Sequence, residues 1–386
     1  MHKTGLALAV LSIFSTAAYA QSTSNVTFYG TVDEAVAYTN NGASSPKPSN
    51  TVLVSSGIFA SSRWGMEGTE DLGGGLKAKF QLEAGFDADT GAMKTYSGNP
   101  STATPAAPGG ASISGLFNRR SYVGLEGNFG GVFVGRDYTP LYWAINRSDP
   151  LKLGLYGNVQ EIVQLSGTGS DRFGRASNAV FYVSPKLDGF QGRAMYSLGS
   201  ESPGGVGAAP KDANHMWGIS GEYVLAGLTI TGAYQQIQLP TVAGTGTAAI
   251  FTGATGTRKD IVAGAKYVFG DYSVAGGYFN TKQPIAHTDA SDIWLGGTTK
   301  LGTGTVLVNF QRMRLDAAVG AAPKATIYAL SYVYPLSKRT SVYASSGIVK
   351  NGSTAAFALA ASDTTVAAAG PGATVKAIAL GITHTF

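Results

Sequence analysis

Polar and apolar residues alternate without interruption through residues 75–86, which read GLKAKFQLEAGF. Lys77, Lys79, Gln81 and Glu83 share one parity, and the apolar residues between them share the other. This period of two is typical of a β-strand with one polar and one apolar face. The apolar face of such a strand packs on a core in a soluble sandwich, but it meets lipid in a transmembrane barrel, whose polar face lines a watery lumen.

Similar segments recur along the whole chain, bounded by Gly, Pro, Asn and Asp. Most are close to the roughly 9–11 residues of a membrane-spanning strand. Sixteen strands are predicted, at 26–39, 57–68, 75–88, 115–128, 131–138, 176–185, 190–198, 215–224, 228–238, 260–269, 272–281, 292–301, 305–316, 325–335, 339–349 and 375–386.

The connections between these segments alternate in length. Every second one is short, such as GNFG, KLDG and LGTG, whereas 89–114, 139–175, 239–259 and 350–374 are long and low in complexity. Short turns on one rim and long loops on the other are the pattern of outer-membrane barrels. The sequence therefore predicts an all-β fold, a 16-stranded antiparallel transmembrane β-barrel.

The last predicted strand supports closure of the barrel. Ile378, Leu380, Ile382 and the final Phe386 share one parity. Pairing of this strand with the first would remove both sheet edges, as a strand wall in lipid requires. Aromatic residues also recur at strand ends, which fits the aromatic girdles of such barrels.

The first twenty residues have the features of a secretory signal peptide. A basic start at Lys3 precedes an apolar stretch and the small-residue site Ala18-Tyr19-Ala20, so cleavage is expected before Gln21. The apolar run is too short for a membrane-spanning helix. We expect one barrel domain over residues 21–386, located in the outer membrane and in contact with its lipid.

Composition agrees with an uncharged outer surface. Charged residues make up 13% of the chain, about half the usual share, and cysteine is absent. Loss of Lys3 with the signal peptide would lower the formal net charge from +5 to +4. This excess is mild and no basic block occurs, so nucleic acid is not an expected partner.

Residues for catalysis or metal binding are sparse. The four histidines lie far apart without metal-ligand spacing, no GxSxG elbow occurs, and the GxG runs lack a third glycine. No enzyme activity, metal or cofactor is expected. An outer-membrane hydrolase with residues assembled across strands stays an alternative, as do an adhesin and a secreted soluble β-sandwich.

Two stretches carry a family resemblance. SSRWGMEGTEDLGGGLKAKFQLEAGFDADTG and FNRRSYVGLEGNFGGVFVGRDYTP resemble strands of the general porins of β-proteobacteria (the Burkholderia and Neisseria type), and a terminal Phe is the usual ending in that family. The resemblance implies a homotrimer whose third long loop folds into each barrel. It also implies passive diffusion of small hydrophilic solutes and ions. A substrate-specific channel of the same fold remains open as an alternative.

Strand parity predicts which charges face the lumen. Arg63 and Arg120 point inward, together with Lys79 and Glu83, while Arg119 points outward. On the outer parity of the first strand lies Glu34, whose carboxylate would be costly near the bilayer midplane. We expect Glu34 near an interface or buried against a neighbouring subunit.

The resemblance implies a ladder of arginines on the wall, formed by Arg63, Arg120, Arg136 and Arg175. Parity from Val132 would turn Arg136 outward, so its strand must bend or end before it.

Carboxylates on the inward loop 139–175 would oppose this ladder. The candidates are Asp149, Glu161 and Asp171, beside the basic Arg147 and Lys152. Because these two basic residues partly cancel the acids, the sequence predicts a weakly anion-selective pore.

Overall fold

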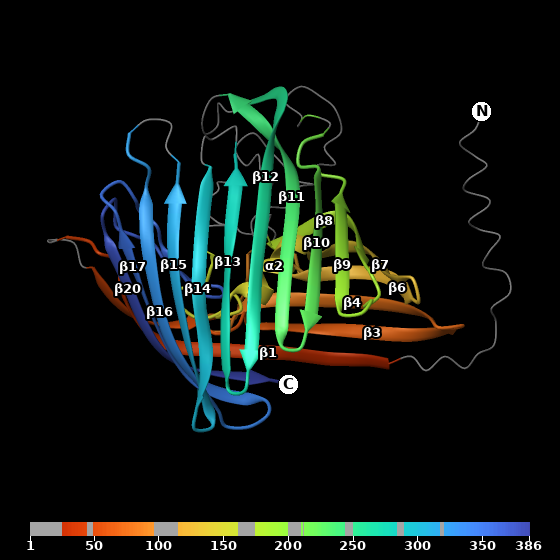
Figure 1. Ribbon diagram of the computed structural model, residues 1–386, viewed down its shortest axis with the longest axis horizontal. Helices are drawn as coiled ribbons and strands as arrows, with labels where there is room; N and C mark the ends of the chain where they lie inside the picture. Colours follow the sequence, from red (N-terminus) through yellow and green to blue (C-terminus); the bar gives the residue numbers. More distant parts are fainter. Residues whose placement is uncertain are drawn as a thin grey trace.

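The computed structural model describes residues 25–44, 49–95, 115–160, 174–199, 210, 212–243, 250–283, 289–316 and 320–386. Sixteen long strands in these ranges form a closed antiparallel barrel (Figure 1). They are β1 (Asn25–Asn40), β3 (Arg63–Gly73), β4 (Leu76–Asp87), β6 (Arg120–Gly127), β7 (Gly130–Tyr138), β8 (Arg175–Val183), β9 (Phe190–Ser197), β10 (Met216–Leu225), β11 (Leu228–Ala243), β12 (Ile250–Phe269), β13 (Tyr272–Lys282), β14 (Ala290–Leu301), β15 (Gly304–Leu315), β16 (Lys324–Pro335), β17 (Thr340–Asn351) and β20 (Thr374–Thr385).

The barrel closes between its first and last strands. β20 pairs with β1 from Thr31 opposite Thr385 to Asn40 opposite Lys376. Phe386 continues the ladder, since its N–H donates to the carbonyl of Gly30 and its carbonyl accepts from the Gly30 N–H, both at 3.1 Å. The predicted sixteen-stranded closed barrel is confirmed.

Alternation sorts the two faces of the wall as the sequence predicted. The outward faces carry exposed apolar side chains, such as Val123, Val134, Ile219, Ile261, Leu295, Leu330 and Leu380. The inward faces carry buried polar side chains, such as Gln81, Glu83, Gln235, Asp260, Asp292, Gln311 and Ser345. Lys77, Lys79, Gln81 and Glu83 therefore belong to the lumenal face of β4.

Five shorter elements accompany the barrel in the described ranges: α2 (Pro140–Ser148), β2 (Asn50–Ser56), β5 (Ala92–Met93), and β18 (Leu359–Ala360) and β19 (Thr365–Val366), which form a small hairpin. Helix α2 lies inside the barrel behind β11 and β12 (Figure 1). No helix in the described ranges is long and apolar enough to cross a membrane.

The predicted strand at 57–68 is wrong in its first half. β2 pairs with the Glu34–Asn40 half of β1 and β3 pairs with the Asn25–Thr31 half, so residues 57–62 leave the sheet between them. Asp33 stabilises the segment 57–62, because its Oδ1 accepts hydrogen bonds from the N–H groups of Ile58 (2.8 Å) and Phe59 (3.0 Å). A one-dimensional pattern cannot reveal a carboxylate that reaches across to another strand.

Two other boundaries differ. The predicted strand 115–128 begins at Arg120, after a turn. The connection expected at 239–259 is largely an extension of β11 and β12, which pair as far as Ala243 opposite Ile250 and project beyond the neighbouring strands (Figure 1).

The inside of the barrel also holds a hydrophobic core. Apolar side chains of α2 and the residues after it pack on inward-facing residues of β12 to β16, including Leu141, Ile145, Leu151, Leu155, Phe279, Trp294, Met313 and Ile327. Part of the inner wall is therefore apolar where a polypeptide segment covers it, and the aqueous path is confined to the rest of the lumen.

Candidate functional site

Helix α2 is the start of the inward-folded third loop. Thr139 caps it, with its Oγ1 accepting the N–H of Tyr142 at 3.1 Å, and Pro140 occupies the first turn, where its missing N–H is harmless. Leu141, Ala144 and Ile145 form the buried stripe that faces the wall. The predicted inward folding of this loop is thus visible in its described part, residues 139–160.

The helix is fixed closely against the barrel wall. Gly264 of β12 has no side chain, and a Cβ there would collide with Ser148. Trp294 of β14 donates its Nε1–H to the carbonyl of Ser148 at 2.9 Å. Further along the loop, Asn309 and Gln311 donate to the carbonyl of Gly157. These contacts hold the loop across the lumen.

Asp149 does not face the pore, contrary to the prediction. It is 1% exposed, and its carboxylate accepts the N–H groups of Leu151 (3.0 Å), Leu153 (2.8 Å) and Val159 (3.5 Å). Burial raises its pKa to about 6, although these three donors favour the ionised form. Asp149 therefore shapes the loop.

The final long loop, residues 350–374, is predicted only as a connection between strands, but it also turns inward. The N–H of Gly157 donates to the carbonyl of Ala360 at 2.9 Å. The N–H of Leu155 donates to the carbonyl of Ile58, in the segment 57–62, at 2.6 Å. Phe357 and Leu359 are buried in the same core. The apolar run AAFALAA within this loop was the available sequence signal. Among the described residues, parts of 57–62, 139–160 and 350–374 all narrow the lumen.

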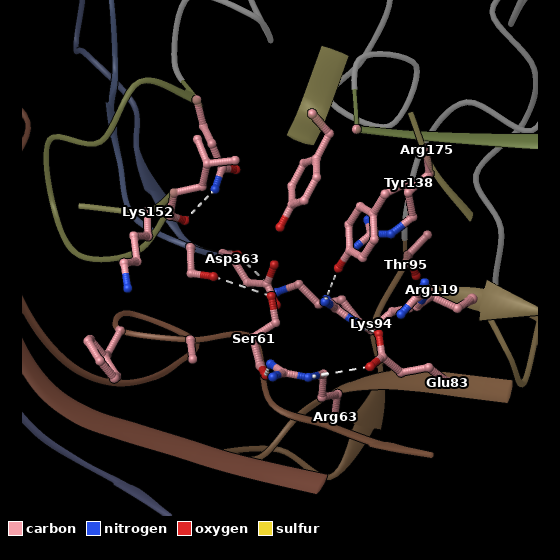
Figure 2. A pocket seen from close by; sticks show the side chains of 18 of the residues that line it. Ser61, Arg63, Glu83, Lys94, Thr95, Arg119, Tyr138, Lys152, Arg175 and Asp363 are labelled. Carbon is pink, nitrogen blue, oxygen red and sulfur yellow. Dashed lines mark hydrogen bonds and ion pairs between the residues drawn. The ribbon is translucent and has the colours of Figure 1, made fainter. Parts of the chain in front are cut away.

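These segments and the wall enclose a cavity of about 540 Å³, which is the constriction of the lumen. Among the described residues that line it, the basic side chains are Arg63, Lys94, Arg119, Arg120, Lys152 and Arg175, and the acidic ones are Glu83 and Asp363. Figure 2 shows Arg63, Arg119 and Arg175 on one side of the cavity and Lys152 on the other. The lining is thus strongly positive, and Arg63, Arg120, Arg175 and Glu83 were all among the predicted site residues.

Glu83 is the central carboxylate of this wall. Its Oε1 lies 2.7 Å from Nε of Arg119, and its Oε2 lies 3.4 Å from Nε of Arg63 and accepts the hydroxyl of Tyr29 at 3.1 Å. Arg119, predicted to face outward, is therefore lumenal and 4% exposed. The prediction failed because Arg119 lies in the turn before β6, where strand parity does not apply.

Tyr138 joins two of the arginines. Its hydroxyl accepts from Nη2 of Arg119 at 2.6 Å and from Nη2 of Arg175 at 3.0 Å, and the guanidinium of Arg175 lies 4.6 Å from the ring centroid. Tyr142 of α2 stacks on Tyr138 with centroids 4.1 Å apart, and burial raises the pKa of Tyr142. The stack links the inward helix to the arginine wall.

Arg120 has a different environment. Asp137 binds it in a bidentate pair of 2.7 and 2.9 Å, which balances its charge locally. Asp137 reaches the lumen because a bulge in β7 shifts the register between Gly135 and Asp137. This bulge is the bend that the sequence predicts in this strand before Arg136.

Even so, Arg136 does not line the cavity. It is 6% exposed, and it donates to the carbonyl of Asn118 (2.9 Å) and to Oγ of Ser177 (2.8 Å), so it braces neighbouring segments of the wall.

The remaining predicted charges are placed as follows. Lys79 is lumenal and pairs with Glu126 at 2.8 Å, away from the constriction. Arg147 pairs with Glu222 of β10 at 2.5 Å, so its charge is balanced by the wall. Glu161 and Asp171 lie outside the described residues.

A closed barrel with an apolar outer face, a polar inner face and a charged constriction defines a membrane channel. The chain matches the Gram-negative porin family over residues 7–354, and it belongs to that family. It is an outer-membrane protein that provides a passive diffusion path for small hydrophilic solutes.

Relatives and solved structures agree with this assignment. The chain is 31% identical to outer membrane porin protein 32 of Delftia acidovorans over the full length of both chains. It is 28% identical to an outer membrane porin of Bordetella pertussis, covering 91% of this chain and 95% of that one. An anion-selective porin from Comamonas acidovorans superimposes with a TM-score of 0.76 at 26% identity, covering 94% of this chain and all of the other.

Proposed function

We propose that this porin prefers anions and that Arg63, Arg119, Arg175 and Lys152 create the preference. The observation that carries this proposal is the lining of the constriction, where six basic side chains face two acidic ones. Arginine stays charged at physiological pH, and charges of one sign in a narrow path with low-dielectric walls concentrate ions of the opposite sign.

The inward loop strengthens this field. The acids of this loop were predicted to oppose the arginines, but Asp149 is buried in the loop and Arg147 is paired with Glu222. The described part of the loop contributes Lys152 to the cavity lining. The anion selectivity of the Comamonas acidovorans porin agrees with this proposal.

The test is the reversal potential of single channels in a KCl gradient. Arg63→Gln with Arg175→Gln should lower the preference for chloride, and the difference should shrink at 1 M salt, where the Debye length is about 3 Å. Arg314→Gln is the matched control, since Arg314 is exposed beside Asp316 at the end of β15. A wild-type channel that prefers potassium would refute the proposal.

We also propose a homotrimer that forms through the outer faces of β1, β20, β17 and β16. This face carries an apolar depression of about 620 Å³, and Glu34 lies in it with both carboxylate oxygens shielded from solvent. Val54, Tyr334 and Leu380 are among the residues that line this depression. An outer membrane protein of Vibrio cholerae in a trimer form has a similar fold, with a TM-score of 0.65 at 17% identity.

Cross-linking in native-like membranes tests the assembly. Trimers are expected for wild type, and Leu380→Lys should weaken them because it places a charge in this apolar face. Detection of monomers alone in wild-type membranes would contradict the proposal.

The relatives are porins, so we propose transport without catalysis for this chain as well. We further propose that residues 1–20 are a signal peptide. Amino-terminal sequencing of protein from the outer membrane should begin at Gln21.

A further inference from the structure

A second, smaller cavity adjoins the constriction, at the point where β7 runs into α2. It has a volume of about 180 Å³ and shares Arg120 and Tyr138 with the larger cavity. Its other walls include Trp143 of α2, Phe133 of β7 and Phe181 of β8. The two cavities therefore border each other at Arg120 and Tyr138.

The walls of this cavity are unusually aromatic for a lumen that conducts water and ions. Tyr122 and Phe133 meet edge to face with centroids 5.1 Å apart, and Tyr138 and Trp143 meet edge to face at 5.8 Å. Phe181 is 5% exposed and belongs to an apolar cluster on the inner wall. Diffusion of hydrophilic solutes alone does not require such rings on the lumenal face.

The cavity also has a positive edge. The guanidinium of Arg193 lies 5.2 Å from the ring centroid of Trp143, and its Nη2 donates to the neutral Oε1 of Gln191 at 3.0 Å. Nearby Glu222 forms its ion pair with Arg147. Arg120, on another wall, is held by Asp137. Arg193 is therefore the guanidinium best placed to bind an incoming anion.

We propose that this cavity is a subsite for single-ring aromatic carboxylates. The carboxylate would bind Arg193, and the ring would pack against Trp143 and Phe133, where edge-to-face and stacked contacts are favourable. The size fits one ring, since an apolar cavity of about 150 Å³ is sufficient for benzene. The inference rests on the proposed anion channel and names a class of solute for it.

Block of the chloride current by added carboxylates tests the site, with benzoate, cyclohexanecarboxylate, acetate and neutral benzamide as probes. Benzoate should reduce the current at a concentration about tenfold lower than acetate, which corresponds to about 1.4 kcal/mol. Cyclohexanecarboxylate should fall between them, because it fills the cavity without aromatic contacts. Benzamide should block no better than acetate, because it lacks the charge.

Variants separate the two halves of the site. Trp143→Leu should reduce the preference of benzoate over cyclohexanecarboxylate, with Phe133 left as the remaining ring contact, while Arg193→Gln should weaken the block by both carboxylates. Arg314→Gln, which removes an exposed arginine outside the lumen constriction, should leave the ligand series unchanged. The open-channel conductance in KCl reports whether each variant forms an intact pore.

Equal block of the wild-type channel by benzoate and acetate would overturn the subsite and leave the anion preference intact. A wild-type channel without preference for chloride would overturn the proposed anion selectivity, even if benzoate still blocked better than acetate. If Trp143→Leu yields no channels, the wild-type series of four probes still decides the proposal.

Discussion

Replacement of Glu83 by Gln tests the charge balance of the constriction most directly. Glu83 is the carboxylate shared by Arg63 and Arg119, and its side chain is 6% exposed. Glutamine keeps the size and an acceptor oxygen but removes the negative charge. The variant should be more selective for anions than wild type, because two guanidinium groups lose their counter-charge.

The size of the effect follows from Coulomb's law. At low salt, a unit charge acting through water on an ion about 8 Å away changes its energy by about 0.5 kcal/mol. The energy of chloride in the pore falls by this amount and that of potassium rises by it, so the difference between the two ions changes by about 1 kcal/mol. The ratio of chloride to potassium permeability should rise roughly fivefold at low salt.

The Glu83→Gln variant should fold, but with a lower free energy of unfolding. Removal of one partner of a buried ion pair costs about 3–5 kcal/mol. The retained oxygen of Gln can still accept from Arg119, so the loss should lie at the lower end of that range. Thermal unfolding followed by circular dichroism measures it.

The selectivity assay is the reversal potential in a KCl gradient at low and high salt. Glu126→Gln is the matched control, since Glu126 is a lumenal carboxylate paired with Lys79 and 40% exposed. It should change selectivity much less than Glu83→Gln. An unchanged permeability ratio in Glu83→Gln, or an equal shift in the control, would refute the assignment of Glu83 to the constriction.

Three further predictions concern the inward loop. Because the pKa of Asp149 is raised from 3.8 to about 6, its contribution to stability is complete below about pH 4 and falls by about 3 kcal/mol as the pH rises through 6. Asp149→Asn should remove this part of the pH dependence of thermal unfolding, and identical pH profiles would contradict it. Trp294→Phe removes the hydrogen bond to Ser148, worth about 1 kcal/mol, and should increase open-channel noise. Gly264→Val should displace α2 and raise single-channel conductance, and an unchanged conductance would show that α2 does not narrow the pore.

The sequence alone determined the wall of this protein. Period-two alternation reports which face a side chain takes, so the barrel, its sixteen strands and the lumenal positions of Lys79 and Glu83 were all predictable. Strand pairing in a closed barrel is sequential, and the short connections left little freedom in the topology. Arg63 and Arg120 were found by the same parity.

Tertiary structure decided what lies inside the wall. Arg119 sits in a turn and Asp137 follows a bulge, so parity misplaced the first and could not foresee the partner of Arg120. The roles of Asp33 and Asp149 depend on backbone N–H groups of folded segments, which no periodicity encodes.

The positions of the inward loops also depend on tertiary contacts. Whether Phe357 in a long loop meets solvent or a core depends on the surface opposite it, here supplied by residues far away in the chain, such as Leu155 and Ile327. Strand direction is a local property of the backbone, whereas the constriction is assembled from contacts between distant segments. That is why the sequence predicts the barrel and only the three-dimensional arrangement shows which charges meet at its narrowest part.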